Sequence, residues 1–101
     1  MSLPIITPAE AMRLVDKGAI LIDIRRADEH ARERIPGARN QPVDSLGSID
    51  CKSRPIIFHC MSGFRTEIHA AKLEAAASCK GFIVEGGIEA WKKAGLPVTV
   101  L

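Results

Sequence analysis

The chain lacks the long apolar segment that a membrane-spanning helix requires. None of its hydrophobic runs approaches the ~20 residues needed to cross a bilayer. Its start, MSLPIITPAE, also lacks the basic segment and long apolar stretch of a secretory signal peptide. We therefore predict a cytoplasmic protein with no membrane segment in this chain, although a parent protein could carry a membrane anchor.

A basic surface of the kind that binds nucleic acid is also missing. The formal net charge is only +2, and the positive residues are scattered along the sequence. Four arginines do fall between Arg25 and Arg34, but an aspartate and two glutamates are mixed among them. Since nucleic-acid-binding surfaces show a clearer basic patch or stripe, we predict no nucleic-acid partner.

The cysteine pattern does not indicate a metal site or a disulfide scaffold. There are three cysteines, Cys51, Cys60 and Cys79, with no C-x-x-C pair and no Cys/His spacing typical of zinc. We predict reduced thiols in a cytosol-like compartment, no metal and no cofactor. Cys51 lies in a polar connector and is expected to be exposed, whereas Cys79 ends a helix and is expected to be structural.

Length and composition indicate one globular domain. The 101 residues are 47% hydrophobic and 26% charged, as in an ordinary soluble protein. We predict a single domain over residues 1–101, in which residues 1–3 could be a remnant of cloning. The chain could also be a domain cut from a longer protein.

Strand-like and helix-like segments alternate along the chain. Short apolar runs at 19–24, 54–58 and 82–85 are typical of strands buried on both faces. The helical segments are 8–17, with Thr7 as N-cap, then 26–35, 66–80 and 88–94. This order predicts an α/β fold with a central, mostly parallel sheet of about five short strands and helices on both faces.

Two chemically distinctive residues follow the ends of predicted strands. In parallel sheets, ligands bind outside the carboxyl ends of the strands. Asp23 ends the first clear strand, and Cys60 follows the second. Cys60 therefore lies where this architecture places its chemistry.

The loop CMSGFR, residues 60–65, joins that second strand to a helix. Backbone N–H groups at a helix start have no partners within the helix, so a tight loop can direct them at an anion. We expect these groups to stabilise a Cys60 thiolate. Gly63 permits unusual backbone angles, Ser62 and Thr66 add hydroxyl groups, and Arg65 adds a positive charge. Nucleophilic attack on phosphorus or arsenic, or on sulfur, would suit such a loop.

Three segments resemble the rhodanese family, the thiosulfate sulfurtransferases. HCMSGFRT resembles the active-site loop, LIDIRRADEHARERIPGARN the first signature, and VEGGIEAWKKAGLPV the closing segment of the family. The resemblance extends from about Pro4 to Val98. The chain is similar to small single-domain bacterial rhodaneses, some of which are fused to a membrane anchor. It implies a rhodanese-like domain.

The resemblance also implies a reaction and its residues. Cys60 would attack the outer sulfur of thiosulfate or of a small persulfide, become a persulfide, and pass the sulfur to cyanide or a thiol. Asp23 and Arg25 match the family's Asp-x-Arg and are expected to support the site from a neighbouring strand end. The residues implied in substrate binding are Met61, Ser62, Gly63, Phe64, Arg65 and Thr66.

Loop length separates the chemistries within this superfamily. The sulfurtransferases have a six-residue loop, whereas the related phosphatases and arsenate reductases have one residue more. The spacing from Cys60 to Arg65 is C-x4-R, which favours sulfur. A phosphatase or arsenate reductase is the less favoured alternative. A persulfide carrier or interaction module with little turnover is hardly distinguished from the enzyme by sequence.

Some residues depart from the family pattern. Arg34 stands where a histidine often precedes Ile-Pro-Gly, and Met61 follows the cysteine where a basic or polar residue is common. With the apolar Phe64, these changes favour a persulfide on a small thiol or a partner protein over thiosulfate as the natural donor. Of the histidines, His30 is predicted at the surface, and His59 is predicted to point away from Cys60.

Overall fold

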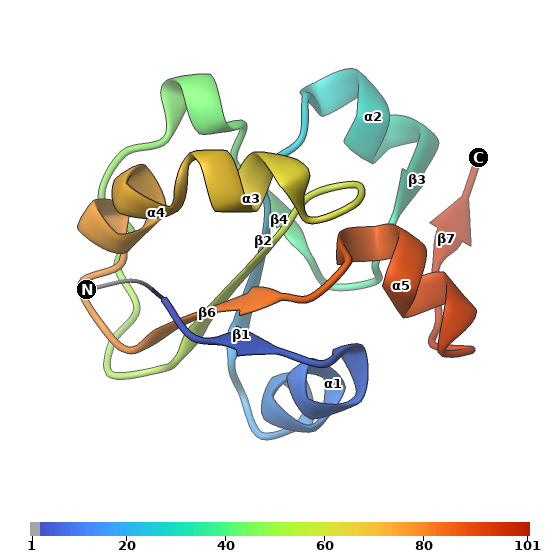
Figure 1. The fold of residues 1–101 in the computed structure, drawn as a ribbon, viewed down its shortest axis with the longest axis horizontal. Coiled ribbons are helices and arrows are strands. Elements are labelled where there is room, and N and C mark those ends of the chain that lie inside the picture. Colours follow the sequence, from blue (N-terminus) through green and yellow to red (C-terminus); the bar gives the residue numbers. More distant parts are fainter. Residues whose placement is uncertain (1–2) are drawn as a thin grey trace.

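Parallel pairing organises the computed structural model, which describes residues 3–101 (Figure 1). Five strands form one sheet in the order β1-β6-β5-β2-β4, and every pair of neighbours is parallel. These strands are β1 (Ile5–Ile6), β2 (Ile20–Asp23), β4 (Arg39–Asn40), β5 (Ile56–His59) and β6 (Gly81–Val84). The predicted α/β fold class is confirmed.

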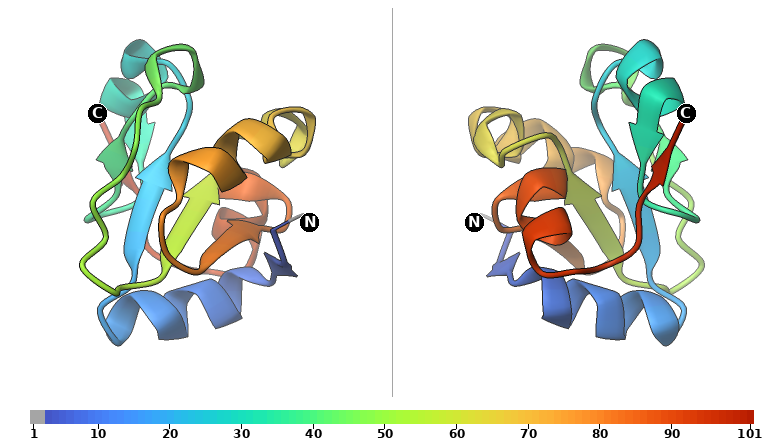
Figure 2. Two further views of the ribbon diagram at one scale, coloured as in Figure 1. Left: turned by 90° about the vertical axis from the view of Figure 1, so that its left-hand side faces the viewer. Right: turned by 90° about the vertical axis from the view of Figure 1, so that its right-hand side faces the viewer.

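Helices cover both faces of the sheet, as Figure 2 shows: α4 crosses in front of the strands in one view and α5 in the other. Each helix follows a strand or connector along the chain. Their bounds are α1 (Pro8–Asp16), α2 (Ala27–Arg32), the 3₁₀ turn η1 (Val43–Ser45), α3 (Phe64–Ile68), α4 (Ala70–Ala76) and α5 (Gly87–Lys93). The predicted N-cap is confirmed, since Thr7 and Glu10 exchange hydrogen bonds of 3.1 and 3.0 Å in a capping box.

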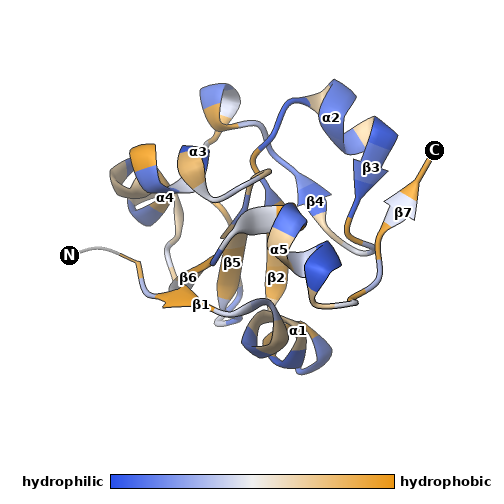
Figure 3. Ribbon diagram, turned by 45° about the vertical axis from the view of Figure 1, so that its right-hand side comes forward, coloured by the Kyte–Doolittle hydropathy of each residue, from blue (hydrophilic) through white to orange (hydrophobic). Residues whose placement is uncertain are grey.

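The central strands are buried on both faces because their side chains alternate between two hydrophobic clusters. Ile56, Phe58 and Cys60 belong to the cluster beneath α4, whereas Ile57 belongs to the cluster beneath α1 and α5. Figure 3 shows the resulting hydrophobic centre, with the hydrophilic α2 at the periphery. Cys60 therefore enters the site from the α3–α4 face of the sheet.

Two predicted helices are shorter than expected. The segment 26–35 is helical only to Arg32, because β3 (Glu33–Arg34) pairs antiparallel with β7 (Thr99–Val100). The segment 66–80 starts earlier, at Phe64, and is divided into α3 and α4 at His69. It ends at Ala76 because Ala77 is extended and forms a bridge with Ile49.

Leu3, the first described residue, takes part in the core. Leu3 is 8% exposed and belongs to the cluster beneath α4. The other two residues of the suggested cloning remnant, Met1 and Ser2, lie outside the described residues. Within residues 3–101, no helix has the length and apolar character needed to cross a membrane.

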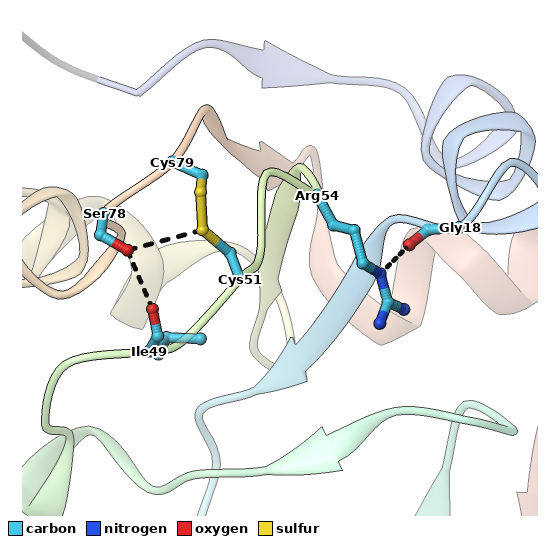
Figure 4. The surroundings of a disulfide bond; sticks show 6 residues. All are labelled: Gly18, Ile49, Cys51, Arg54, Ser78 and Cys79. Carbon is cyan, nitrogen blue, oxygen red and sulfur yellow. Dashed lines mark hydrogen bonds between the residues drawn. A yellow bond between two sulfur atoms is a disulfide. The ribbon is translucent and has the colours of Figure 1, made fainter.

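A disulfide joins Cys51 and Cys79, so the prediction of reduced thiols was wrong for these two residues (Figure 4). The pairing arises because Ile49 donates to the Ala76 carbonyl at 3.0 Å, which brings the connector alongside the end of α4. The Cα atoms of the two cysteines are 6.3 Å apart. Cys51 is also buried, at 3% exposure, and not exposed as predicted.

Reduction of this disulfide should destabilise the protein. The bond closes a long loop, with a sequence separation of 28, and by chain entropy such a cross-link contributes about 3.6 kcal/mol to the free energy of unfolding. We expect urea denaturation to show a loss of that size after treatment with a dithiol reductant. The Cys51→Ala/Cys79→Ala variant should have the lower stability with or without reductant. Equal stability of the oxidised and reduced protein would contradict this expectation.

Candidate active site

Cys60 lies directly beyond the carboxyl end of β5, where sequence reasoning placed the nucleophile. Its residue exposure is 1%, so the thiol is enclosed by the protein. The Gly63 N–H donates to Cys60 Sγ over 3.1 Å, and Thr66 Oγ1 lies 3.8 Å from the same sulfur. The sulfur is thus contacted by a main-chain donor and by a hydroxyl group.

The loop depends on a left-handed conformation at Gly63, where φ is +95°. A residue with a side chain would be strained there, and its Cβ would lie 3.3 Å from the Gly86 nitrogen. The Gly63 carbonyl accepts hydrogen bonds from the Thr66 hydroxyl (2.8 Å) and the Glu67 N–H (3.1 Å). These bonds start α3 and fix the glycine peptide whose N–H reaches the sulfur.

The start of α5 supports the loop from behind. The Ile88 N–H donates to the Cys60 carbonyl (2.9 Å), and the Glu89 N–H donates to the Met61 carbonyl (3.0 Å). Gly87 has φ of +60°, and a Cβ there would lie 2.5 Å from the Cys60 carbonyl oxygen. The adjacent glycines Gly86 and Gly87 before a helix are a signal of close backbone approach that the sequence analysis did not use.

The loop residues differ in exposure. Gly63 and Thr66 are buried, Met61 and Arg65 are intermediate, and Ser62 and Phe64 are exposed. Met61 borders a hollow on one side of the loop that Arg25 and Glu29 also line. Ser62, Gly63 and Phe64 border a second hollow on the other side, with Ile5, Glu67 and the start of α5.

Arg65 is engaged by a residue that sequence reasoning missed. Its two terminal nitrogens bind the two carboxylate oxygens of Glu29, on α2, over 2.7 and 2.9 Å. The Arg65 hydrogen bonds hold the pKa of Glu29 below its ordinary value. The side chains are 31% and 13% exposed, so solvent screens the pair only partly. Arg65 therefore presents a largely neutralised charge to the loop.

Asp23 and Arg25 form a buried ion pair at the end of β2, the strand beside β5. The Arg25 side chain donates to both Asp23 oxygens, at 2.9 and 2.8 Å, and also to the Glu33 carbonyl at 2.5 Å. Asn40 adds hydrogen bonds to the Asp23 and Arg25 carbonyls. Burial opposes ionisation of Asp23, but bonds from Arg25 and His30 outweigh it and lower its pKa.

His30 belongs to this cluster and is not the surface residue that we predicted. Its Nδ1 lies 2.8 Å from Asp23 Oδ2, and its side chain is 17% exposed. The prediction failed because the surrounding charges resembled a solvated helix face, whereas α2 folds back over the end of β2. Among residues 3–101, no group of three or more His, Cys, Asp or Glu side chains could hold a metal ion.

His59 is fully buried on β5, opposite Asp23 in the pairing register. Its Nδ1 lies 3.1 Å from the Cys60 carbonyl oxygen, whereas its Nε2 is buried and has no hydrogen-bond partner among the described residues. Burial of the imidazole lowers the pKa of His59. The ring is therefore neutral near pH 7, with Nδ1–H as the donor to the Cys60 carbonyl.

The family profile of the rhodanese-like domain matches residues 7–94 of the chain. The chain belongs to the rhodanese-like domain family. It is 31% identical, over 92% of its length and 87% of the relative's, to the thiosulfate sulfurtransferase GlpE of Actinobacillus succinogenes. It is 33% identical to a sulfurtransferase of Allochromatium vinosum, over 87% and 86% of the two chains.

Solved structures of rhodanese-like proteins have the same fold. A rhodanese-related protein of Thermoplasma volcanium superposes with a TM-score of 0.82 at 24% identity, covering 97% of this chain and 99% of that one. A protein of unknown function from Rhodopseudomonas palustris, described as a possible tyrosine phosphatase, gives 0.76 at 28% identity over 96% and 85% of the two chains.

Substitution of Gly87 should displace the active-site loop. We expect Gly87→Ala to lower stability by roughly 2 kcal/mol or more, since its Cβ would overlap the Cys60 and Met61 carbonyl oxygens at a left-handed position. Thermal unfolding measures the loss. Gly95→Ala is the matched control, because Gly95 is also left-handed, with φ of +77°, and nothing lies within 4 Å of its added Cβ. Equal effects of the two substitutions would contradict this support by α5.

The stability of this rhodanese-like protein should fall as the pH drops below about 6.5, the ordinary pKa of histidine. In that range the unfolded chain binds a proton on His59 that the folded protein excludes, because the folded pKa is lower. Urea denaturation at pH 7.5 and pH 5.5 measures the change. His59→Asn, which keeps a donor near the Cys60 carbonyl, should reduce the pH dependence. An unchanged pH dependence would show that other groups cause it.

Proposed function

We propose that this rhodanese-like chain is a sulfurtransferase that uses Cys60 as its nucleophile and carries the transferred sulfur as a Cys60 persulfide. The observation that supports this most directly is the Gly63 N–H bond to Cys60 Sγ, within a loop of family length at the carboxyl end of β5. The named activity of its relatives, thiosulfate sulfurtransferase, agrees with this chemistry.

In the first step, the Cys60 thiolate attacks the outer sulfur of thiosulfate or of a small persulfide. A new S–S bond forms at Cys60 while the donor's own S–S bond breaks. With thiosulfate, the electron pair of the broken bond leaves on sulfite, and no net proton is transferred. The enzyme then carries one additional sulfur atom as a persulfide anion.

In the second step, an acceptor takes the outer sulfur of the persulfide. Cyanide attacks it to form thiocyanate, and the electron pair of the enzyme S–S bond returns to Cys60 as a thiolate. A thiolate acceptor reacts in the same way and leaves as a persulfide. The cycle needs no metal and no redox cofactor, because each attack is a displacement at sulfur.

One main-chain N–H and one hydroxyl group of the loop region support these steps. Gly63 donates to the negative sulfur, and the Thr66 hydroxyl can rotate from the Gly63 carbonyl toward it. Cys60 is nearly fully buried, so a donor must reach it by a local movement of the loop. The hollow beside Met61 is the approach that we favour, since Met61 follows the nucleophile directly. Asp23 and Arg25 support the neighbouring strand end.

A phosphatase is the second candidate, because one structural neighbour is described as a possible tyrosine phosphatase. The loop from Cys60 to Arg65 is one residue shorter than in the related phosphatases. A shorter ring of amides suits one sulfur atom better than a phosphate group. Cys60-dependent hydrolysis of a phenyl phosphate ester would reverse this ranking. A stable persulfide with slow turnover would instead favour a carrier role.

The nucleophile is tested by Cys60→Ser, which should abolish transfer of sulfur from thiosulfate to cyanide, measured as thiocyanate. Intact-protein mass spectrometry should show one added sulfur on the unmodified protein after incubation with thiosulfate, and none on the variant. The Cys51→Ala/Cys79→Ala variant is the control and should retain most of the activity at a temperature where it is folded. Full activity of Cys60→Ser would refute the proposal.

A further inference from the structure

We propose that Glu29 sets the charge of the sulfur donor that the site prefers, by neutralising Arg65. The preferred donor is then a sulfane-sulfur compound that carries one negative charge or none at its reacting end, such as a persulfide of a small thiol or a thiosulfonate. This inference deepens the proposed function and rests on it. Thiosulfate, a dianion, is accepted at a disadvantage that Glu29 imposes.

The first support is the geometry of the pair. Both terminal nitrogens of Arg65 are bound by Glu29 in a bidentate arrangement, at 2.7 and 2.9 Å. Arg65 offers a sulfur donor no unpaired positive charge, because the Glu29 carboxylate lies against its guanidinium group. A dianion that bound Arg65 in the same way would have to displace Glu29 or accept its repulsion.

The second support is that the other arginines near the loop are paired as well. Arg25 binds Asp23, and Arg26 and Arg32 both bind Asp28. The hollow beside the loop contains carboxylates among these arginines; its lining residues are Arg25, Arg26, Glu29, Arg32, Glu33 and Met61. Arg26 and Arg32 share one carboxylate, so one positive charge remains among them, but their side chains are 71% and 77% exposed and are screened by solvent. Arg25, the buried arginine of this hollow, is paired with Asp23 and offers a dianion no free charge.

If Glu29 acts through its charge, the effect of removing it should depend on the charge of the reagent, whereas a purely structural role of Glu29 would affect all reagents alike. The energy between a fixed charge and a donor is proportional to the donor's charge, and salt weakens it. Removing the Glu29 charge should leave neutral reagents unaffected and favour anions. The factor for a dianion should be the square of the factor for a monoanion at the same position.

The test compares Glu29→Gln with the unmodified protein at low ionic strength. Glutamine still accepts the Arg26 N–H that Glu29 Oε1 receives at 3.0 Å, so the start of α2 is kept. Loading of Cys60 is followed by intact-protein mass spectrometry with benzenethiosulfonate, which carries one negative charge, and with thiosulfate, which carries two. We expect Cys60 to be loaded faster in Glu29→Gln than in the unmodified protein, about threefold with benzenethiosulfonate and roughly tenfold with thiosulfate.

A second measurement does not depend on sulfur transfer. Alkylation of Cys60 by iodoacetamide, which is neutral, and by iodoacetate, which is anionic, reports the local charge directly. Iodoacetamide should react at the same rate with Glu29→Gln and the unmodified protein, and iodoacetate about threefold faster with the variant. Glu29→Asp keeps the charge and should behave as the unmodified protein. Asp16→Asn, an exposed position at the end of α1, removes the same charge far from the loop.

The outcomes are distinguishable. Equal rate changes for neutral, singly charged and doubly charged reagents would overturn the inference while Cys60 still loads with sulfur. The same charge dependence in Asp16→Asn would also overturn it, since the effect would then follow net charge and not Glu29. If the iodoacetate effect appears but no sulfur loads on Cys60 from either donor, the proposed function fails and the donor preference fails with it.

Discussion

The site depends on two helix starts, those of α5 and α3, which hold the backbone of the loop that carries Cys60. The first amides of α5 bind the carbonyls of Cys60 and Met61, so these oxygens are occupied on the outer side of the loop. The left-handed Gly63 then turns its N–H to the sulfur on the inner side. For the nucleophile that we propose, this main-chain donor takes the place of a charged side chain in contact with the sulfur.

With a main-chain donor at the sulfur, the charged side chains around the site are free to pair with one another. The proposed displacement at sulfur requires a nucleophilic sulfur and a leaving group, and the Gly63 N–H contacts that sulfur. Arg65 can then serve to join the loop to α2 through Glu29, over a sequence separation of 36. The buried Asp23–Arg25 pair and His30 do the same at the end of β2. Ionic groups around this site therefore act first as connections between elements.

The sequence was sufficient for the features that are local. Continuous apolar runs predicted the central strands. A loop was predicted directly after the second of them, at Cys60–Arg65, and it is found there but is shorter, since α3 begins at Phe64. It was insufficient where the determining contact is distant in sequence. The Cys51–Cys79 bond, the Glu29–Arg65 pair and the pairing of β3 with β7 each join segments that no short motif connects. His30 was misread for another reason: Asp23 is near in sequence, but no motif indicates that α2 brings His30 back to the end of β2.

The disulfide and Cys60 lie at opposite ends of the central sheet. Cys51 precedes β5 and Cys79 precedes β6, so the bond lies at the amino ends of the strands, whereas Cys60 lies at the carboxyl end. The four residues of β5 span about 13 Å. Thiol–disulfide exchange requires direct attack of one sulfur on another, so the Cys60 sulfur, at the other end of β5, is not placed to attack this bond in the folded protein. The disulfide can therefore stabilise the fold without taking part in the sulfur transfer that we propose for Cys60.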